Sequence, residues 1–222
     1  SKYFDRRDYA VSHADIVIQS FHPVKHITTG EGGALITNSK KIYDKALQLR
    51  SHGIIRDKNR HWVYDIKDYS FNYRISEINC ALGQSQIQNI DKRINFKRKI
   101  ALNYDNFFKK FNFIKIPVNS KILFNSYHLY PIKIEFYKIR STRDEMFNFF
   151  LKNNIRLQVH YVPTYRLKVF RKFRILKNFR NTEKFFSQIV SIPIFYNIST
   201  KEIKKIKKTF LKFFKKKKIF YN

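Results

Sequence analysis

The chain has 222 residues, 43% of them apolar, which is enough for one large domain or two small ones with a buried core. Its single cysteine, Cys80, excludes an internal disulfide framework and any multi-cysteine metal site, and we expect a small buried residue in a reducing compartment. No apolar run reaches the roughly 20 residues of a membrane-spanning helix, and the first residues lack the layout of a secretion signal. We therefore expect a cytoplasmic protein with no membrane association and no metal.

The formal net charge of +30 is compatible with nucleic-acid binding, because Lys and Arg that neutralise phosphates drive sequence-independent affinity. Seventeen basic residues follow position 167, against only Glu183 and Glu202, so half of the net charge lies in the last quarter of the chain. Lys, Asn, Ile, Phe and Tyr are all abundant and all have A/T-rich codons, so genome composition also explains much of the excess. We expect only non-specific nucleic-acid affinity from this charge.

The first half of the chain alternates short apolar strands with helices. Residues 14–21 (ADIVIQSF) are apolar and partly β-branched, which predicts a buried strand, and residues 33–37 (GALIT) predict a second one. Residues 39–53 predict a helix that a glycine ends, and residues 76–90 predict another with small residues suited to close packing. The polar, charged stretch 92–111 predicts a helix that connects two lobes.

The second half of the chain has the pattern of an α+β domain. The pattern predicts a strand over 127–136, a helix over 141–154, a strand or loop over 156–163 and a closing helix over 198–214. The two helices begin at capping pairs, Ser141 with Asp144 and Ser199 with Glu202. Apolar residues recur at helical spacing in the closing helix, which predicts one packed face and one solvated lysine face.

One loop combines a lysine with an unusual density of glycines. In SFHPVKHITTGEGG (residues 20–33), three of the chain's five glycines fall within four positions, five residues after Lys25. A lysine at the edge of a core is partly desolvated, which favours the neutral amine needed for Schiff-base chemistry. Thr hydroxyls and glycine amides allow an anion to approach closely. A P-loop does not fit, because its glycines precede the lysine, whereas a tight turn between two strands remains the alternative to catalysis.

Three blocks in fixed order resemble the signature of the DegT-type sugar aminotransferases. They are ADIVIQSFHPVKHITTGEGGALIT (14–37), LRSHGI (49–54) and FNYRISEINCALGQSQI (71–87). Further on, HLYPI, NNIRLQVHYVPTY and SIPIF resemble the C-terminal lobe of the members that aminate a UDP-linked 4-keto sugar on the way to pseudaminic acid. The resemblance implies an α/β fold of the pyridoxal-phosphate (PLP) fold-type I, or aspartate aminotransferase-like, class. It also implies the end of the large domain over 1–91, a connecting helix over 92–112 and a small α+β domain over 113–222.

The resemblance also assigns roles to individual residues. Lys25 matches the lysine that binds PLP as a Schiff base and then moves a proton between cofactor and substrate. Ser20 matches a serine whose hydroxyl binds the cofactor phosphate, and Asn72 matches an asparagine that reaches this phosphate from the partner subunit of a homodimer. His160 and Tyr161 fall where the family lines its sugar-nucleotide pocket. The implied substrates are a UDP-linked 4-keto-6-deoxy sugar and an amino-acid donor, expected to be glutamate.

The sequence departs from the family pattern at its beginning. The family has an upstream Asp-x-x-His element whose aspartate keeps the pyridine nitrogen of PLP protonated, and none of Asp5, Asp8 and Asp15 is followed three positions later by His. We therefore expect a C-terminal portion of an aminotransferase, as a fragment, a split gene product or a truncated reading frame, that is inactive alone. Two alternatives remain, a basic nucleic-acid-binding protein and a sugar dehydratase of the same fold. The dehydratase has histidine in place of the Schiff-base lysine, and Lys25 therefore favours transamination.

Overall fold

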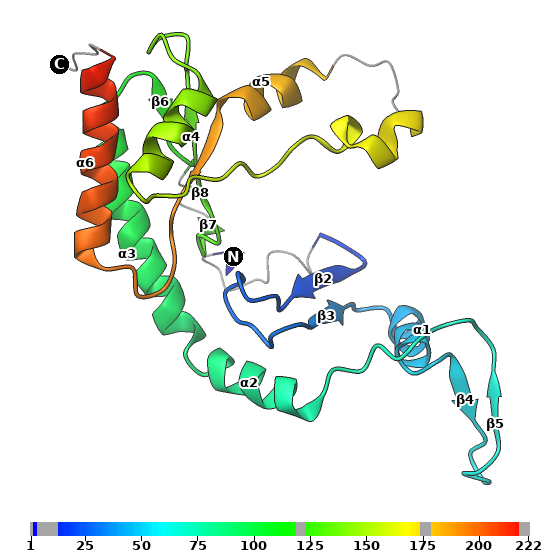
Figure 1. Ribbon diagram of the computed structural model, residues 1–222. Helices are drawn as coiled ribbons and strands as arrows, with labels where there is room; N and C mark the ends of the chain where they lie inside the picture. Colours follow the sequence, from blue (N-terminus) through cyan, green and yellow to red (C-terminus); the bar gives the residue numbers. More distant parts are fainter. Residues whose placement is uncertain (1, 4–12, 119–122, 174–178, 218–222) are drawn as a thin grey trace. The chain divides into compact units, whose positions relative to one another are not determined.

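A computed structural model describes residues 2–3, 13–118, 123–173 and 179–217 (Figure 1). The chain divides into two compact units. Unit 1 comprises Ser1–Ile94 with Ser120–Asn125, and unit 2 comprises Asn95–Asn119 with Ser126–Asn222. The division into domains 1–91, 92–112 and 113–222 stays a prediction.

Unit 1 is built from small antiparallel strand pairs and two helices. Its elements are β1 (Lys2–Tyr3) paired with β7 (Leu123–Phe124), β2 (Val17–Ser20) paired with β3 (Gly33–Ile36), α1 (Lys40–Arg50), β4 (Ile54–Arg56) paired with β5 (Tyr64–Ile66), and α2 (Glu77–Ile87). The strands and helices expected over 14–53 and 76–90 are confirmed. Each helix begins where a serine can cap it, since Ser39 accepts from the Ile42 N–H and Ser76 from the Asn79 N–H.

The apolar strands of unit 1 lie at the surface of the described structure. The prediction of a buried strand over 14–21 is wrong on burial, because three of the four β2 side chains are exposed and Ile18 is 71% accessible. Cys80, also expected to be buried, is exposed on α2. The physical reason is the same in both cases, since no described residue covers these faces.

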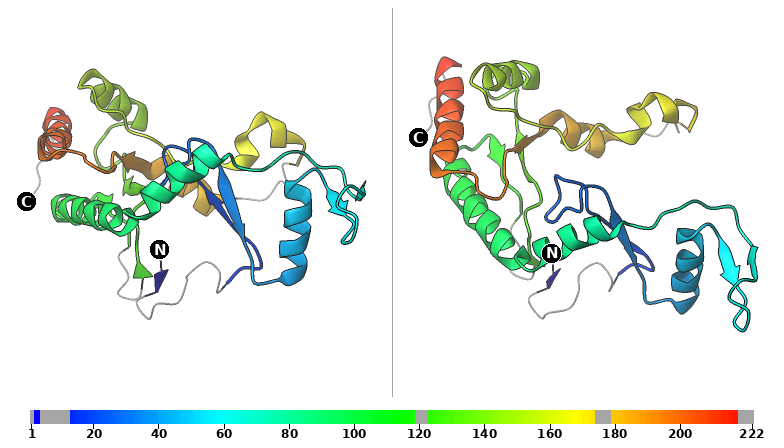
Figure 2. Two further views of the ribbon diagram at one scale, coloured as in Figure 1. Left: turned by 90° about the horizontal axis from the view of Figure 1, so that it is seen from below. Right: turned by 60° about the horizontal axis from the view of Figure 1, so that its bottom comes forward.

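Unit 2 contains a three-stranded antiparallel sheet and four α-helices (Figures 1 and 2). The sheet order is β6 (Ile114–Lys115), β8 (Tyr130–Ile134) and β9 (Ile189–Ile192). The helices are α3 (Ile90–Phe108), which begins in unit 1, α4 (Arg143–Lys152), α5 (Arg180–Gln188) and α6 (Thr200–Lys216). Two 3₁₀ turns, η1 (Thr164–Arg166) and η2 (Lys168–Phe173), precede α5. The expected strand 127–136 and the helices over 92–111, 141–154 and 198–214 are confirmed, whereas β9 and α5 were not expected.

One capping pair differs from the expectation by one residue. In α4 the cap is Thr142, whose hydroxyl accepts from the Glu145 N–H at 3.2 Å, and the predicted Ser141–Asp144 pair does not cap the helix. Ser141 instead donates to Glu145 Oε2 at 2.5 Å, so both hydroxyls converge on the same glutamate. In α6 the predicted Ser199–Glu202 capping box is confirmed.

Aromatic side chains fill the core of unit 2. The Phe108 ring of α3 meets the Phe210 ring of α6 edge to face with centroids 4.9 Å apart, and Phe150 of α4 meets Phe210 at 4.5 Å. A buried polar pair adjoins this cluster, since the Tyr130 hydroxyl donates to Asp105 Oδ1 at 2.5 Å. Burial and this hydrogen bond both raise the pKa of Tyr130, so the phenol stays protonated and keeps donating.

Truncation of Phe210 is expected to destabilise unit 2. Phe210→Ala removes the ring that joins α3, α4 and α6, and it should lower the free energy of unfolding by about 3–5 kcal/mol because a cavity remains. Leu151→Ala on α4 is the control, since Leu151 is exposed and should change stability by less than about 0.5 kcal/mol. Urea unfolding followed by circular dichroism measures both, and equal losses would contradict this account of the core.

No helix among the described residues is long and apolar enough to cross a membrane. The same residues contain no group of three or more His, Cys, Asp or Glu placed to hold a metal ion.

Candidate active site

The loop between β2 and β3 brings Ser20 and Lys25 into one closed segment of unit 1. Ser20 is the last residue of β2 and pairs with Gly33, the first residue of β3. The loop is closed at its base by the Phe21 N–H, which donates to the Gly32 carbonyl at 2.9 Å. Half-buried Lys25 ends a tight turn in which its N–H donates to the His22 carbonyl at 2.9 Å. The lysine therefore lies on backbone held at both ends by hydrogen bonds.

The glycines of this loop are required by conformation and by contact. Gly30 has φ of +78° and Gly32 has φ of +153°, which side-chain-bearing residues rarely adopt. Gly33 is required for a different reason, since a Cβ there would lie 2.7 Å from the Gln19 carbonyl oxygen of β2. The alternative reading, a tight turn between two strands, is thus present, and the same turn carries Lys25.

A methyl group at Gly33 is expected to separate β2 from β3. In Gly33→Ala the new Cβ collides with backbone that cannot rotate away, so amide protection in β2 and β3 should fall by at least tenfold. Gly30→Ala is the control, because its Cβ meets nothing within 4 Å and only the cost of positive φ, about 1 kcal/mol, remains. Hydrogen exchange measures amide protection in both variants. If β2 and β3 were protected equally well in Gly33→Ala and in Gly30→Ala, the predicted clash at Gly33 would be contradicted.

Helix α2 supports the loop from within unit 1. The Thr28 N–H donates to Gln86 Oε1 at 3.2 Å, and the Asn79 side chain donates to the Glu31 carbonyl at 3.4 Å. Thr29 is buried, and its hydroxyl donates to the Glu31 carbonyl at 2.7 Å. These contacts fix the backbone on the side of the loop opposite to its base.

Ser20 and Asn72 each retain a donor suited to an anion. The Ser20 hydroxyl oxygen accepts from the His22 N–H at 3.4 Å, which leaves its O–H to donate elsewhere. Asn72 pairs with Ser51 in an isolated bridge, and its Oδ1 accepts from the Arg74 N–H at 3.2 Å. The Asn72 NH₂ group has no hydrogen-bond partner among the described residues. Asn72 does not cap α2, since Ser76 does so.

His160 and Tyr161 lie in unit 2, next to strand β9. Gln158 and Ser191 exchange two backbone hydrogen bonds of 2.7 and 3.2 Å, which register this segment on the edge of the sheet. His160 Nδ1 lies 2.8 Å from the hydroxyl of buried Ser191, while the exposed Tyr161 ring packs edge-on against the imidazole at 4.6 Å. The segment expected to be a strand or loop is therefore a loop with one bridge, and it holds His160 in a fixed orientation.

A carboxylate at the start of α5 fixes the turn η1 that follows this segment. Glu183 Oε1 accepts from the Tyr165 hydroxyl at 2.7 Å and from Arg166 Nε at 3.0 Å, and its Oε2 pairs with Arg166 Nη2. The Arg166 guanidinium also lies over the Phe186 ring, 4.8 Å from its centroid. The sequence pattern did not indicate this cluster, because the partners are 17 and 18 positions apart with no recognisable motif.

Lys25, Ser20 and Asn72 have side chains of the chemical types that PLP needs. A half-buried amine, a hydroxyl and an amide are the groups that an aldehyde and a phosphate ester require. The geometry alone does not name a reaction, and comparison with known proteins supplies the family.

Curated relatives of this chain include transaminases. The chain is 39% identical over 212 residues to the UDP-4-amino-4,6-dideoxy-N-acetyl-beta-L-altrosamine transaminase of Campylobacter jejuni strain 81-176, covering 93% of this chain and 54% of the relative. It is 31% identical to the Helicobacter pylori protein of the same description, over 90% of this chain and 52% of the relative. The chain thus spans about half the length of the curated relatives it matches.

Solved structures agree with this relationship. Helicobacter pylori PseC, described as an aminotransferase involved in the biosynthesis of pseudoaminic acid, superposes with a TM-score of 0.83 at 29% identity, covering 91% of this chain and 54% of that chain. A Streptococcus pneumoniae protein, Spr1654, described as a sugar aminotransferase and solved in its PLP form, has the same fold at 24% identity, with a TM-score of 0.84 over 97% of this chain and 55% of that chain.

The fold class expected from the sequence, α/β of PLP fold-type I, is confirmed by these structures. Residues 5–211 match the DegT/DnrJ/EryC1/StrS aminotransferase family over most of the chain. The chain therefore belongs to the DegT/DnrJ/EryC1/StrS aminotransferase family.

Proposed function

We propose that this chain is the C-terminal part of a PLP-dependent transaminase that aminates a UDP-linked 4-keto-6-deoxy sugar, with glutamate as the amino donor, for pseudaminic acid or a related surface glycan. The observation that carries the proposal is Lys25, which lies in the glycine-rich β2–β3 turn of a chain that matches the family over residues 5–211. Similarity to transaminases of a UDP-linked amino sugar supports the substrate class. Within this proposal residues 1–91 form the end of the large domain, 92–112 the connecting helix and 113–222 the small domain, in the cytoplasm.

Lys25 is the residue that binds the cofactor covalently and moves protons. PLP, when bound, supplies an electron sink that stabilises negative charge at the substrate carbon. The His22–Lys25 turn holds the backbone of half-buried Lys25, which lies on the same loop as Ser20. This placement lets one amine bind the cofactor and later carry a proton at Nζ. A dehydratase of this fold is disfavoured, because it has histidine at the position of the Schiff-base lysine. Here that position is Lys25, and the histidines His22 and His26 lie beside it.

Ser20 and Asn72 hold the cofactor phosphate in this proposal. The Ser20 O–H and the Asn72 NH₂ group are both left to donate, and both are suited to phosphate oxygens. In the family the asparagine acts across a subunit interface, so the proposal includes a homodimer with shared active sites. Exposed aromatic rings in the segment 62–73, which contains Asn72, support a covering partner, and a second copy of the chain is the partner we propose. These rings belong to Trp62, Tyr64, Tyr69, Phe71 and Tyr73.

His160 and Tyr161 contact the sugar nucleotide in this proposal. Ser191 anchors the imidazole at 2.8 Å, which leaves the exposed Tyr161 ring and hydroxyl to meet a ligand. Glu183 acts behind them as a positioning residue, because it holds η1 through Tyr165 and Arg166.

The test combines the chain with the part of a relative that it does not span. The chain is co-produced with the N-terminal portion of the Campylobacter jejuni relative, and amination of a UDP-4-keto-6-deoxy sugar by glutamate is followed by mass spectrometry. The proposal expects glutamate- and PLP-dependent gain of an amino group. Amination of a GDP- or dTDP-linked sugar in preference to the UDP-linked one would reject the substrate class, and no amination of any keto sugar would reject the activity.

A further inference from the structure

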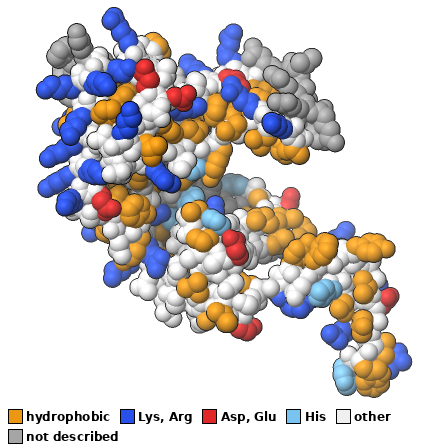
Figure 3. Space-filling view, viewed as in Figure 1, with side chains coloured by type: hydrophobic (Ala, Val, Ile, Leu, Met, Phe, Trp, Pro, Cys, Tyr) orange, Lys and Arg blue, Asp and Glu red, His pale blue; other side chains and the backbone are white. Residues whose placement is uncertain are grey.

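Helix α6 carries a row of lysines along its exposed face. Eight of its 17 residues are lysine and only Glu202 is acidic. Lys201, Lys205, Lys208 and Lys212 follow one another at intervals of three or four positions, so they share one face, and all four are exposed. Figure 3 shows lysine and arginine side chains gathered over the part of unit 2 where α6 lies. A lysine excess that arose from genome composition alone would place lysines all over the surface, whereas the lysines of this row lie together on one face of α6.

The opposite face of α6 is committed to the core of unit 2. Phe210, Phe213 and Phe214 are at most 2% exposed. Their rings pack against α3, α4 and Phe111, which follows α3. An amphipathic helix that binds membranes inserts its apolar face into the lipid, and α6 cannot do so without unfolding unit 2. Charge is therefore the means by which the exposed face of α6 can bind a partner.

The lysine row borders a concave groove. The groove has a volume of about 520 Å³ and is lined by α6 and by Asn153 at the C-terminal end of α4. Five lysines line it, namely the row of four and Lys204. From Lys201 to Lys212 the helix axis advances about 16 Å, and one strand of nucleic acid places about five phosphates in this length.

We propose that the α6 groove, defined by Asn153, Lys201, Lys204, Lys205, Lys208 and Lys212, binds the phosphate backbone of a nucleic-acid strand without sequence preference. No aromatic residue lines the groove, so it offers no stacking platform for bases. Contacts to phosphates alone position a strand and carry no sequence information. The inference does not rest on transaminase activity, because none of these residues takes part in it.

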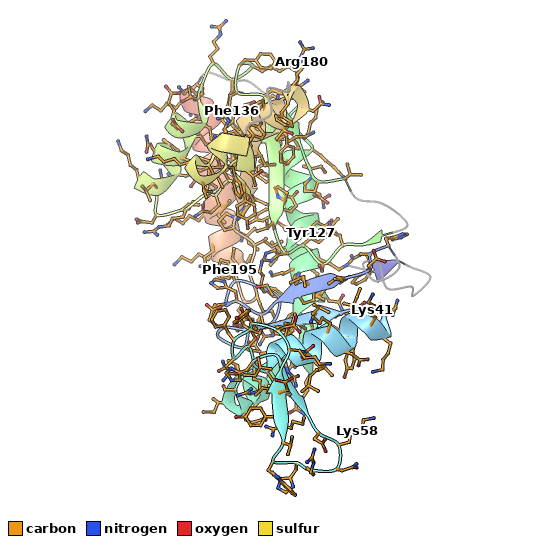
Figure 4. All side chains as sticks on the ribbon, turned by 90° about the vertical axis from the view of Figure 1, so that its right-hand side faces the viewer. Lys41, Lys58, Tyr127, Phe136, Arg180 and Phe195 are labelled. Carbon is orange, nitrogen blue, oxygen red and sulfur yellow. The ribbon has the colours of Figure 1, made fainter. Side chains whose placement is uncertain are left out.

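The experiment compares two variants with equal net charge, each made in the full chain. The α6 variant replaces the four lysines of the row by Gln, and the control replaces four exposed lysines of unit 1 by Gln. The control residues are Lys41, Lys58, Lys67 and Lys92, of which Lys41 on α1 and Lys58 in the β4–β5 loop are labelled in Figure 4. Fluorescence anisotropy follows binding of a labelled 20-nucleotide DNA strand of mixed sequence between 50 and 200 mM NaCl.

The α6 variant is expected to bind more than tenfold more weakly at 50 mM salt. The slope of log K against log salt should also fall in magnitude by about 3, since each neutralised lysine removes about 0.7. The unit 1 control should lose less than threefold in affinity. A third variant, with Arg in place of the four lysines of the row, should keep the affinity of the unmodified chain. Equal losses in both variants would assign the binding to diffuse charge and overturn the proposal. Tighter binding to phosphatidylglycerol vesicles through the same four lysines, or a clear base preference, would overturn it as well.

Discussion

Replacement of Lys25 by Ala in the chain co-produced with the N-terminal portion of its Campylobacter jejuni relative is expected to abolish covalent capture of PLP. Borohydride reduction of the unmodified pair should attach the cofactor to one lysine, and peptide mapping should place the label in the segment 20–37. The physical reason is that Lys25 combines a half-buried amine with a loop closed by hydrogen bonds next to the Ser20 hydroxyl. Transamination should fall by at least about 10³-fold with it, because one amine binds the cofactor and moves the proton.

Two controls separate this role from a general effect of losing a lysine. Lys41→Ala removes an exposed lysine of α1 and should leave the label and the activity unchanged. Lys25→Arg keeps the positive charge without a nucleophilic amine, so it should lose the label as completely as Lys25→Ala does. A label found on another lysine in the unmodified protein would assign the Schiff base elsewhere.

These 222 residues produced alone are expected to show no transamination above background. They supply Lys25 as the proposed Schiff-base lysine and Ser20 as the proposed phosphate-binding hydroxyl, but no Asp-x-x-His element that would hold the pyridine nitrogen protonated, so the electron sink would be incomplete. The apolar faces of unit 1 should also bind the dye ANS strongly, because large side chains on its strands are exposed. These include Ile18, Leu35, Ile36, Ile55 and Ile66.

The measurement follows amination and ANS fluorescence for the chain alone and for the chain co-produced with the relative's N-terminal portion. The co-produced pair should gain activity and lose most of the ANS signal as the exposed faces become covered. A homodimer formed by the chain alone would cover part of unit 1 without restoring activity, and analytical ultracentrifugation detects it. Full activity from the isolated chain would contradict the prediction that groups outside these 222 residues are needed for transamination.

The helices were the most predictable part of the fold, since their signals are local. The closing helix could be predicted in detail because Ser199, Glu202 and the apolar spacing all point to α6. At α4 the sequence offers two hydroxyls and two acids in succession, and only the backbone geometry selects Thr142 with Glu145. Burial was harder to predict. An apolar strand such as the one containing Ile18 indicates that it packs against another apolar surface, but the sequence of the strand does not show whether that surface is present.

The site divides along the same line between local and distant signals. Lys25, Ser20 and the glycine-rich turn adjoin one another in sequence, and resemblance to a family could name them before the fold was known. The roles of Lys25, Ser20, Asn72, His160 and Tyr161 all stay predictions, as they depend on a bound cofactor, a partner subunit and a substrate. The Glu183–Arg166 pair could not be predicted, because a side-chain contact between η1 and α5 depends on how those elements pack.

The single bridge between Gln158 and Ser191 bears on how this protein can evolve. Two backbone hydrogen bonds hold the segment to the edge of β9, while the sheet itself is completed by β6 and β8 and the core by α3, α4 and α6. In the proposed function, substitutions at exposed Tyr161 and Val162 would therefore alter the surface presented to a ligand at little cost to folding, whereas His160 is tied to buried Ser191. Under the proposed function, selection for a new sugar would act on these few codons while the scaffold accumulates neutral change.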